Sequence, residues 1–530
     1  MFFTSYEFIG FIALLFLLYY IVPKKIQWAL LLIASYIFYF IAGPSFIIYI
    51  LVTTITVYLT GRMIQANIDR QNEYIRQHKS EMTREDKKAY KQKQKAIRLR
   101  WLVLCVLINL GILVVVKYSN FLIANWNGIA SAFGSQFELS FVSIALPMGI
   151  SFYTFQAIGY LIDVHRGTIE AEKNPFKLAL FISFFPQLIQ GPISRFSDLA
   201  KTMFEQHPFD SRQFFYGLQR MLWGYFKKMV IADRILTGVT TIISDGTTYH
   251  GAYAFVGMIF YTLELYADFT GGIDITIGIA EALGITVQEN FIRPYFSKSL
   301  KEYWRRWHIS MCTWFKDYVF YPVSICKPMQ NFSKFCRRHL GNAVGKRLPV
   351  YVASFTVWFA TGVWHGASWN FIVWGLMNSV ILLVSEEFEP LYNKFHKKFR
   401  FSNTWGYRLF QMGRTFLMIC CLNMFDCYAS VKDTFGAFAS MFTATNWSII
   451  WDGSLFQIGL SGIDYFILLG GTLVMLAVSL IQRSGSVRDK IAARPYPVRF
   501  LIWYGLFLVI LLLGAYGIGY DASQFIYNRF

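Results

Sequence analysis

The chain has 530 residues, of which 55% are hydrophobic and only 15% are charged, and its formal net charge at pH 7 is +19. A soluble globular domain has about 25% charged residues, so the composition argues against a soluble fold. The excess of Lys and Arg alone could indicate nucleic-acid binding. These residues gather between apolar blocks, however, as they do in the cytoplasmic loops of membrane proteins, so we expect membrane lipids and no nucleic acid as partners.

The apolar residues form blocks long enough to cross a bilayer, which takes about 20 residues of helix. The clearest predicted spans are 6–22, 26–43, 44–60, 101–118, 252–267, 349–364, 368–385, 463–481 and 500–519. Further blocks at 141–162, 178–195, 214–232 and 406–425 are interrupted by Pro, Gly or charged residues. We expect an all-α, polytopic helical bundle of roughly ten to fourteen spans, some of them re-entrant. No linker divides residues 1–530 into two domains.

Basic segments predict the orientation of the chain. Lys24 and Lys25 follow the first span, and the Lys- and Gln-rich segment 61–100 follows the third. Because basic loops stay in the cytoplasm, both signals place the N-terminus outside. The first span lacks a preceding basic region, and we expect it to be retained rather than cleaved. Segment 61–100 has few helix-breaking residues and is predicted to form a cytoplasmic helical hairpin, which we interpret as a solvated insertion rather than a docking site.

The sequence gives little support for a bound metal or a permanent cofactor. The seven cysteines form no CxxC pair and no spaced Cys/His set, so neither a disulfide framework nor a metal site is expected. Two further basic stretches, 327–347 and 483–499, could each hold a cytoplasmic loop in place or face an anionic cofactor, and the sequence leaves both interpretations open.

Between residues 260 and 378, polar side chains enter apolar surroundings, and this segment is the predicted catalytic core. A charged side chain at the bilayer centre costs about 2.5–3.5 kcal/mol, so such residues normally face protein or a wet cavity. Glu264 and Asp268 lie one turn apart on a predicted helix. The pair Gly271-Gly272 is predicted to interrupt that helix beside a cavity. Such carboxylates would equally suit a proton-coupled transporter, which stays an alternative.

Residues 301–308 combine cationic and aromatic side chains. On a continuous helix, Lys301, Arg305 and His308 would share one face, with Trp304 beside them. This face suits either substrate binding or an interfacial belt at the level of the lipid headgroups.

His365 lies within the apolar run 359–370, between Trp364 and a small residue, Gly366. An ionisable residue at membrane depth is a candidate for function, although a lone histidine is often a core residue bonded to a backbone carbonyl. From the residues alone, both interpretations of His365 stay open.

Several segments resemble the hallmark motifs of the membrane-bound O-acyltransferase family, and in particular its bacterial polysaccharide branch, which includes the membrane subunit of alginate O-acetylation. They follow in family order at 146–156, 184–193, 268–269, 289–295, 304–310, 314–318 and 364–366. The resemblance covers roughly residues 140–380 and is specific because several separate motifs agree. One segment departs from it, because Val323-Ser324-Ile325-Cys326-Lys327 replaces the Leu-Gly-Gly-Asn of alginate-type members. We therefore expect a different and longer loop at 323–348.

The resemblance implies transfer of an acyl group, expected to be acetyl, from a cytoplasmic thioester to hydroxyls of an extracytoplasmic polysaccharide. It makes His365 the expected base and His308 the second catalytic residue, with substrate-binding roles for Trp304, Arg305, Asp317, Asp268, Asn290 and Trp364. The implied donor is acetyl-CoA or an acyl phosphopantetheine on a carrier protein, with no permanently bound cofactor. An extracytoplasmic acetyltransferase partner is also implied. D-alanyl transfer to teichoic acid, a glycan or lipid transporter and a catalytically silent scaffold are the alternatives.

Overall fold

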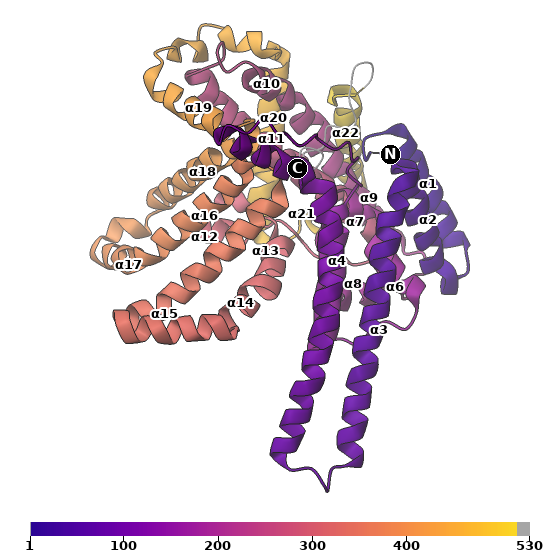
Figure 1. The fold of residues 1–530 in the computed structure, drawn as a ribbon. Helices are drawn as coiled ribbons and strands as arrows, with labels where there is room; N and C mark the ends of the chain where they lie inside the picture. The colour runs from indigo at the N-terminus through magenta and orange to yellow at the C-terminus, as the bar shows by residue number, and fades with distance from the viewer. Residues whose placement is uncertain (1, 517–530) are drawn as a thin grey trace. The chain divides into compact units, whose positions relative to one another are not determined.

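The computed structural model describes residues 2–516, and every regular element in that range is a helix (Figure 1). Within this range, six helices are long and apolar enough to cross a membrane: Lys24–Ala42, Pro44–Gln77, Arg84–Ala132, Trp369–Glu387, Gly462–Ser484 and Tyr496–Leu513. The other predicted spans correspond to helices that are shorter or carry more polar residues. The all-α, polytopic membrane class is therefore confirmed. The end of the predicted span 500–519, from residue 517 onward, lies outside the described residues.

The described chain divides into two compact units that alternate along the sequence. The first consists of Ser5–Phe214 and Ala280–Val287. The second consists of Phe2–Thr4, Phe215–Ile279 and the described residues from 288 onward. Both candidate histidines belong to the second unit, so the site can be described within that unit alone.

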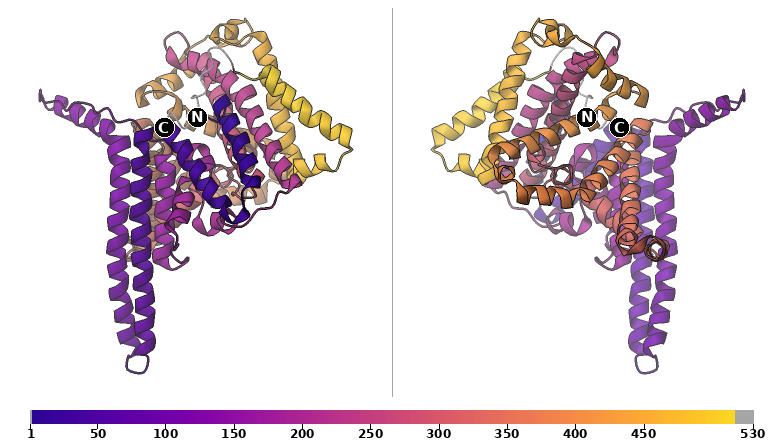
Figure 2. Two further views of the ribbon diagram at one scale, coloured as in Figure 1. Left: turned by 90° about the vertical axis from the view of Figure 1, so that its right-hand side faces the viewer. Right: turned by 90° about the vertical axis from the view of Figure 1, so that its left-hand side faces the viewer.

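The first unit contains the predicted basic hairpin. Its helices are α1 (Tyr6–Ile21), α2 (Gln27–Ala42), α3 (Ile47–Gln77), α4 (Arg84–Ala132), α5 (Ile150–Arg166), α6 (Pro175–Ser183), α7 (Phe185–Gln190) and α8 (Phe196–Met203). The long helices α3 and α4 lie side by side and antiparallel (Figure 2). At their tip, Thr83 and Asp86 form a capping box that starts α4. Along the pair, Arg98 donates to Asn67 and Gln71 across the helices. The predicted helical hairpin is confirmed.

The second unit carries the candidate site. Its helices begin with α9 (Ser211–Tyr225), the π-helical segment η3 (Phe226–Ala232), α10 (Asp233–Ser244), α11 (Ala252–Ala282), α12 (Leu300–Tyr303), α13 (Ile309–Phe315), the π-helical segment η5 (Lys316–Phe320), α14 (Tyr321–Ile325) and α15 (Lys327–His365). They continue with α16 (Trp369–Glu387), α17 (Glu389–Lys398), α18 (Trp405–Cys427), α19 (Val431–Thr443), α20 (Gly462–Ile481), α21 (Val487–Ala492) and α22 (Tyr496–Leu513). Short α12 and α13, rather than one long helix, position the motif around His308.

The predicted break at Gly271-Gly272 is wrong, because α11 runs without interruption through both residues. The glycines serve packing instead. A Cβ added to Gly271 would lie 2.9 Å from the carbonyl oxygen of Gly224, and one added to Gly224 would lie 2.5 Å from the carbonyl oxygen of Gly271. Small residues allow helix backbones in membranes to approach closely. Gly271 therefore allows α11 to pack closely on α9, and the pair makes no break.

The loop predicted at 323–348 is also wrong, since this segment forms the end of α14 and the first half of α15. It is rich in Lys and Arg, which are good helix formers, and Pro328 lies in the first turn of α15, where proline is favoured. Gly341 has a φ of 82° and bends α15 sharply. The departure from the family motif thus gives a bent helix and not a long loop.

Candidate active site

His308 does not lie on a continuous helix with Lys301 and Arg305, so the predicted shared face is wrong. Helix α12 ends at Tyr303, and His308 has a left-handed backbone conformation (φ 47°, ψ 52°) at the N-cap of α13. Its side chain is 0% exposed, whereas Arg305 is exposed. A non-glycine residue with positive φ is uncommon and indicates a local constraint.

That constraint comes from a distant segment of the chain. The backbone N–H of Ile292 donates to the carbonyl of Arg306 at 2.9 Å, and the N–H of Ile309 donates to the carbonyl of Asn290 at 3.0 Å. These two bonds on either side of His308 replace the local bonds of a helix. The left-handed residue between them allows the chain to make both.

The Asn290 side chain fixes the orientation of the His308 ring. Its Oδ1 accepts from both the N–H and the Oγ–H of Ser310, each at 2.9 Å. Because the amide oxygen faces Ser310, the NH₂ group of Asn290 points the other way, toward His308. The Nδ2 atom of Asn290 lies 3.3 Å from Nδ1 of His308. Because Nδ2 can only donate, this contact favours the neutral tautomer of His308 that carries its proton on Nε2.

The surroundings of His308 are aromatic. The ring of Phe269 meets it edge to face with centroids 4.9 Å apart, and the Trp364 indole lies at 6.0 Å. His308 lies outside the six candidate membrane spans, and its complete burial in protein lowers its pKa. Burial disfavours the charged form, so the imidazole is neutral.

His365 is the last residue of α15 and lies among three aromatic rings. Its ring centroid is 4.7 Å from that of Trp374, 5.0 Å from that of Trp364 and 6.3 Å from that of Phe371, with which it stacks. A Cβ added to the following residue, Gly366, would overlap the Phe371 ring. The small residue after the histidine therefore makes room for the ring that stacks on it.

Trp364 joins the two histidines, since its indole is in ring contact with both His308 and His365. The structure thus brings two residues from different segments to one aromatic side chain. The predicted Trp304 lies at the far side of this cluster. Its Nε1 donates to Asn378 at 3.0 Å, and its ring contacts Trp374, the neighbour of His365, with centroids 5.7 Å apart. Trp304 therefore packs behind the aromatic rings that surround His365.

Three further predicted residues, Asp268, Asp317 and Arg305, differ in their burial and contacts. Asp268 is fully buried and forms an ion pair with Lys228 at 2.7 Å, and Lys228 also pairs with Asp233 at 2.7 Å. Asp317 is partly buried on η5, and Arg305 is exposed. Glu264 is buried like Asp268. Two carboxylates around one ammonium form a compensated buried charge cluster, which explains how α11 carries Asp268 through an apolar bundle.

Sequence reasoning did not single out Ser310, Trp374 or Asn378, which complete the site. Asn378 is a fully buried polar residue inside the predicted apolar span 368–385. A buried polar group requires a partner, so its position in that span was a signal that could have indicated a contact such as the one with Trp304.

Comparisons with known proteins show the family of this chain. A model of the membrane-bound O-acyltransferase family (MBOAT) matches residues 171–329. A probable alginate O-acetylase, AlgI, of Azotobacter vinelandii is 34% identical over 388 residues, which are 72% of this chain and 68% of that protein. The chain belongs to the MBOAT family. The resemblance predicted from the motifs is confirmed, and with it the assignment as a multi-pass membrane O-acyltransferase rather than a transporter.

Two other MBOAT relatives are named for different acceptors. A peptidoglycan O-acetyltransferase of Helicobacter pylori is 31% identical over 335 residues, 58% of this chain and 59% of that protein. A teichoic acid D-alanyltransferase of Bacillus subtilis is 28% identical over 265 residues, 49% of this chain and 63% of that protein. The matched part of this MBOAT chain spans two thirds or less of the length of these two relatives.

Proposed function

We propose that this MBOAT transfers an acetyl group from a thioester donor to hydroxyl groups of an extracytoplasmic polysaccharide. The observation that carries the proposal is the contact of His308 and His365 with one indole, that of Trp364, in a chain 34% identical to a probable alginate O-acetylase. Acyl transfer needs a base for the hydroxyl proton and a donor for the developing oxyanion. The two imidazoles can supply one of each.

In this proposal His365 is the base. Its neutral imidazole takes the proton of the acceptor hydroxyl while the hydroxyl oxygen attacks the thioester carbonyl carbon. The tetrahedral intermediate then collapses, the C–S bond breaks, and the imidazolium returns the proton to the leaving thiolate. Histidine suits both steps, because its unperturbed pKa of about 6.5 lies close to physiological pH.

His308 has the complementary role. With its Nδ1 facing the Asn290 amide, its proton is on Nε2, which can donate to the oxyanion of the intermediate. Asn290 is then a positioning residue that sets the tautomer. Trp304 and Trp364 shape the aromatic side of the substrate site. Substrate-binding roles remain proposed for Arg305, Asp317 and Asp268, the last of which is ion-paired with Lys228.

Donor and acceptor lie on opposite sides of the membrane in this proposal, so a passage through the protein joins them at the histidines. The donor is acetyl-CoA or an acyl phosphopantetheine on a carrier protein, used as a co-substrate with no permanently bound cofactor. The chain lies in a bacterial cell membrane with its N-terminus outside. An extracytoplasmic acetyltransferase partner receives the group or completes its transfer to the polysaccharide.

The test replaces His365 by Ala and follows transfer of a radiolabelled acetyl group in purified, reconstituted protein. His396, which lies on α17 and whose Nε2 is 3.4 Å from the Tyr407 hydroxyl, provides a matched control as His396→Ala. We expect transfer to be lost in the first variant and kept in the second. Undiminished transfer by His365→Ala would overturn the assignment of the base.

D-alanyl transfer to teichoic acid is the second candidate, favoured by the similarity to the Bacillus subtilis enzyme. Mass spectrometry of surface glycans from cells with and without the protein separates the two, because an acetyl and an alanyl group differ in mass. Loss of alanyl groups instead of acetyl groups would replace the proposed donor and acceptor while leaving the histidine chemistry unchanged.

A further inference from the structure

A cavity of about 1110 Å³ lies in the second unit, and neither histidine lines it. One wall comes from α9, η3, α11 and the segment 289–293, and the other comes from α20, α21 and α22. Both α20 and α22 pack on η3, and apolar side chains from the three elements form one buried cluster there. The cavity is therefore a built part of this unit, distinct from the proposed catalytic residues.

The wall formed by α20 and α22 is apolar and faces outward. Both helices are candidate membrane spans. Among the side chains that line the cavity, Phe466 is 78% exposed and Ile463 is 71% exposed, and Ile502 on α22 is also exposed. Large exposed apolar side chains on a membrane span contact lipid. The cavity wall is thus continuous with the lipid-facing surface of these helices, so a hydrocarbon chain can enter along them.

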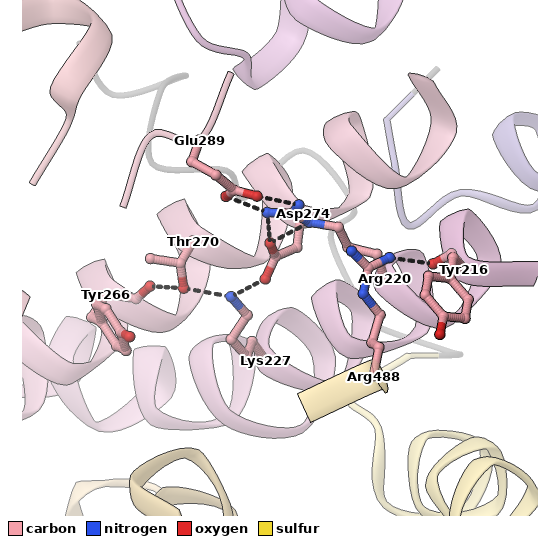
Figure 3. Close-up of polar contacts among 8 residues, drawn as sticks. All are labelled: Tyr216, Arg220, Lys227, Tyr266, Thr270, Asp274, Glu289 and Arg488. Atoms are coloured by element: carbon pink, nitrogen blue, oxygen red, sulfur yellow. Dashed lines mark hydrogen bonds and ion pairs between the residues drawn. The ribbon is translucent and has the colours of Figure 1, made fainter. Parts of the chain in front are cut away.

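The opposite wall carries a network of charged and polar side chains beside apolar ones, and Figure 3 shows the contacts of this network. Arg220 donates two hydrogen bonds to the Glu289 carboxylate, at 2.5 and 2.6 Å, and a further one to Asp274 at 3.0 Å. Lys227 donates to Asp274 at 2.6 Å and to the Thr270 hydroxyl at 2.8 Å. This network holds Arg220 and Lys227 at the cavity surface.

The charges that line the cavity do not cancel. Its lining includes the cations Arg220, Lys227, Arg293 and Arg488 and the carboxylates Asp274 and Glu289, an excess of two positive charges. Arg488 is held at the cavity by α21. Its Nη1 donates to the carbonyl of Tyr216 at 2.8 Å, and its guanidinium lies 5.2 Å from the centre of the Tyr216 ring. The sequence left open whether the basic stretch 483–499 faces an anion, and this geometry favours that interpretation.

We propose that this cavity binds an anionic phospholipid, with its phosphate at Arg488 and Arg220 and its acyl chains along α20 and α22. The guanidinium group of arginine binds phosphate through two parallel N–H donors. Arg220 already binds the Glu289 carboxylate in this way. Basic pockets between membrane helices are known sites for anionic lipid headgroups. A soluble phosphate would leave the apolar wall unused, and a zwitterionic lipid would leave the excess positive charge uncompensated. This inference does not rest on the proposed acyl transfer.

The test compares lipid retention by two variants and two matched controls. Arg488→Ala removes a lining cation, while Lys490→Ala removes a neighbouring cation on the same helix that does not line the cavity. Gly470→Trp fills the apolar part, while Gly505→Trp adds the same side chain elsewhere on the same helical pair. A Cβ at either glycine meets no atom within 4 Å, so the backbone at both positions is open to a side chain.

Each protein is reconstituted with equal amounts of phosphatidylglycerol and phosphatidylethanolamine, extracted into detergent and examined by native mass spectrometry. We expect the wild-type protein to retain phosphatidylglycerol in preference, Arg488→Ala to retain roughly fivefold less of it, and Gly470→Trp to retain neither lipid. Both controls should behave as wild type. A wild-type protein without preference, or variants indistinguishable from their controls, would overturn the proposal. So would displacement of phosphatidylglycerol by acetyl-CoA, because the cavity would then belong to the acyl donor.

Discussion

Replacing Asn290 by Asp tests how the two histidines divide the chemistry. The carboxylate has the same shape as the amide, and one of its oxygens still accepts from the N–H and the hydroxyl of Ser310. The other oxygen, however, replaces the NH₂ group that faces His308 Nδ1. An acceptor in that place draws the imidazole proton to Nδ1, so Nε2 loses the proton that the proposed mechanism donates to the oxyanion.

The expected magnitude follows from the number of contacts that change. One donor to the developing oxyanion is lost, and removal of one such donor typically costs about 10²–10³-fold in kcat. The contacts to Ser310 are kept, so the fold should be little affected. Asn290→Ala is the informative contrast, since it removes the acceptor of both hydrogen bonds from the buried Ser310, at about 1–3 kcal/mol for each.

The assay is acetyl transfer by the reconstituted protein, with thermal unfolding measured in parallel. We expect Asn290→Asp to lose most of its kcat while it keeps its melting temperature, and Asn290→Ala to lose both. Wild-type kcat in Asn290→Asp would refute the assignment of Nε2 of His308 as the oxyanion donor. Equal loss of stability in both variants would show that the contact to His308 Nδ1 serves the fold and not the reaction.

Three further predictions concern packing and charge. Gly366→Ala should abolish acetyl transfer because its methyl group overlaps the ring that stacks on the proposed base, whereas Gly128→Ala, where a Cβ meets open space, should leave transfer unchanged. Lys228→Met should lower the free energy of unfolding by about 3–5 kcal/mol because it removes the cation between two buried carboxylates. Lys201→Met, which breaks an exposed ion pair, should lower it by less than about 1 kcal/mol. Both values are measured by denaturation of the detergent-solubilised protein. Trp304→Phe keeps the aromatic ring but removes its hydrogen bond, so the melting temperature should fall by the equivalent of about 1 kcal/mol with transfer retained.

The fold class and the principal spans could be predicted because they depend on local properties of the sequence. A run such as 463–481 is apolar over enough residues to cross a bilayer, and the structure has α20 at Gly462–Ile481. The hairpin at 61–100 was equally predictable, since good helix formers on both sides of a polar turn leave few other arrangements. In these segments neighbouring residues alone determine the structure.

The errors arose where distant segments determine the local backbone. The 301–308 segment has a helical pattern, but its backbone bonds to 290–292 override that pattern and place His308 in a left-handed conformation. The pair Gly271-Gly272 resembles a helix break, and only its partner Gly224 on another helix shows that it is a contact. The family motifs pointed to the site residues themselves. The contacts that orient these residues, such as that of Asn290 with His308, join distant segments and could be seen only in the structure.

The segment 289–293 connects the two sites that this MBOAT presents. Glu289 is 54% exposed and reaches Arg220 at the cavity, whereas the next residue, Asn290, is fully buried and faces His308. Phe291 then lines the cavity and packs on Trp307 with ring centroids 4.9 Å apart. Asn290 is thus the one residue of this segment that faces His308, while Glu289 and residues 291–293 line the cavity. One short backbone segment therefore carries both the contact of Glu289 with Arg220 at the cavity and the contact of Asn290 with His308.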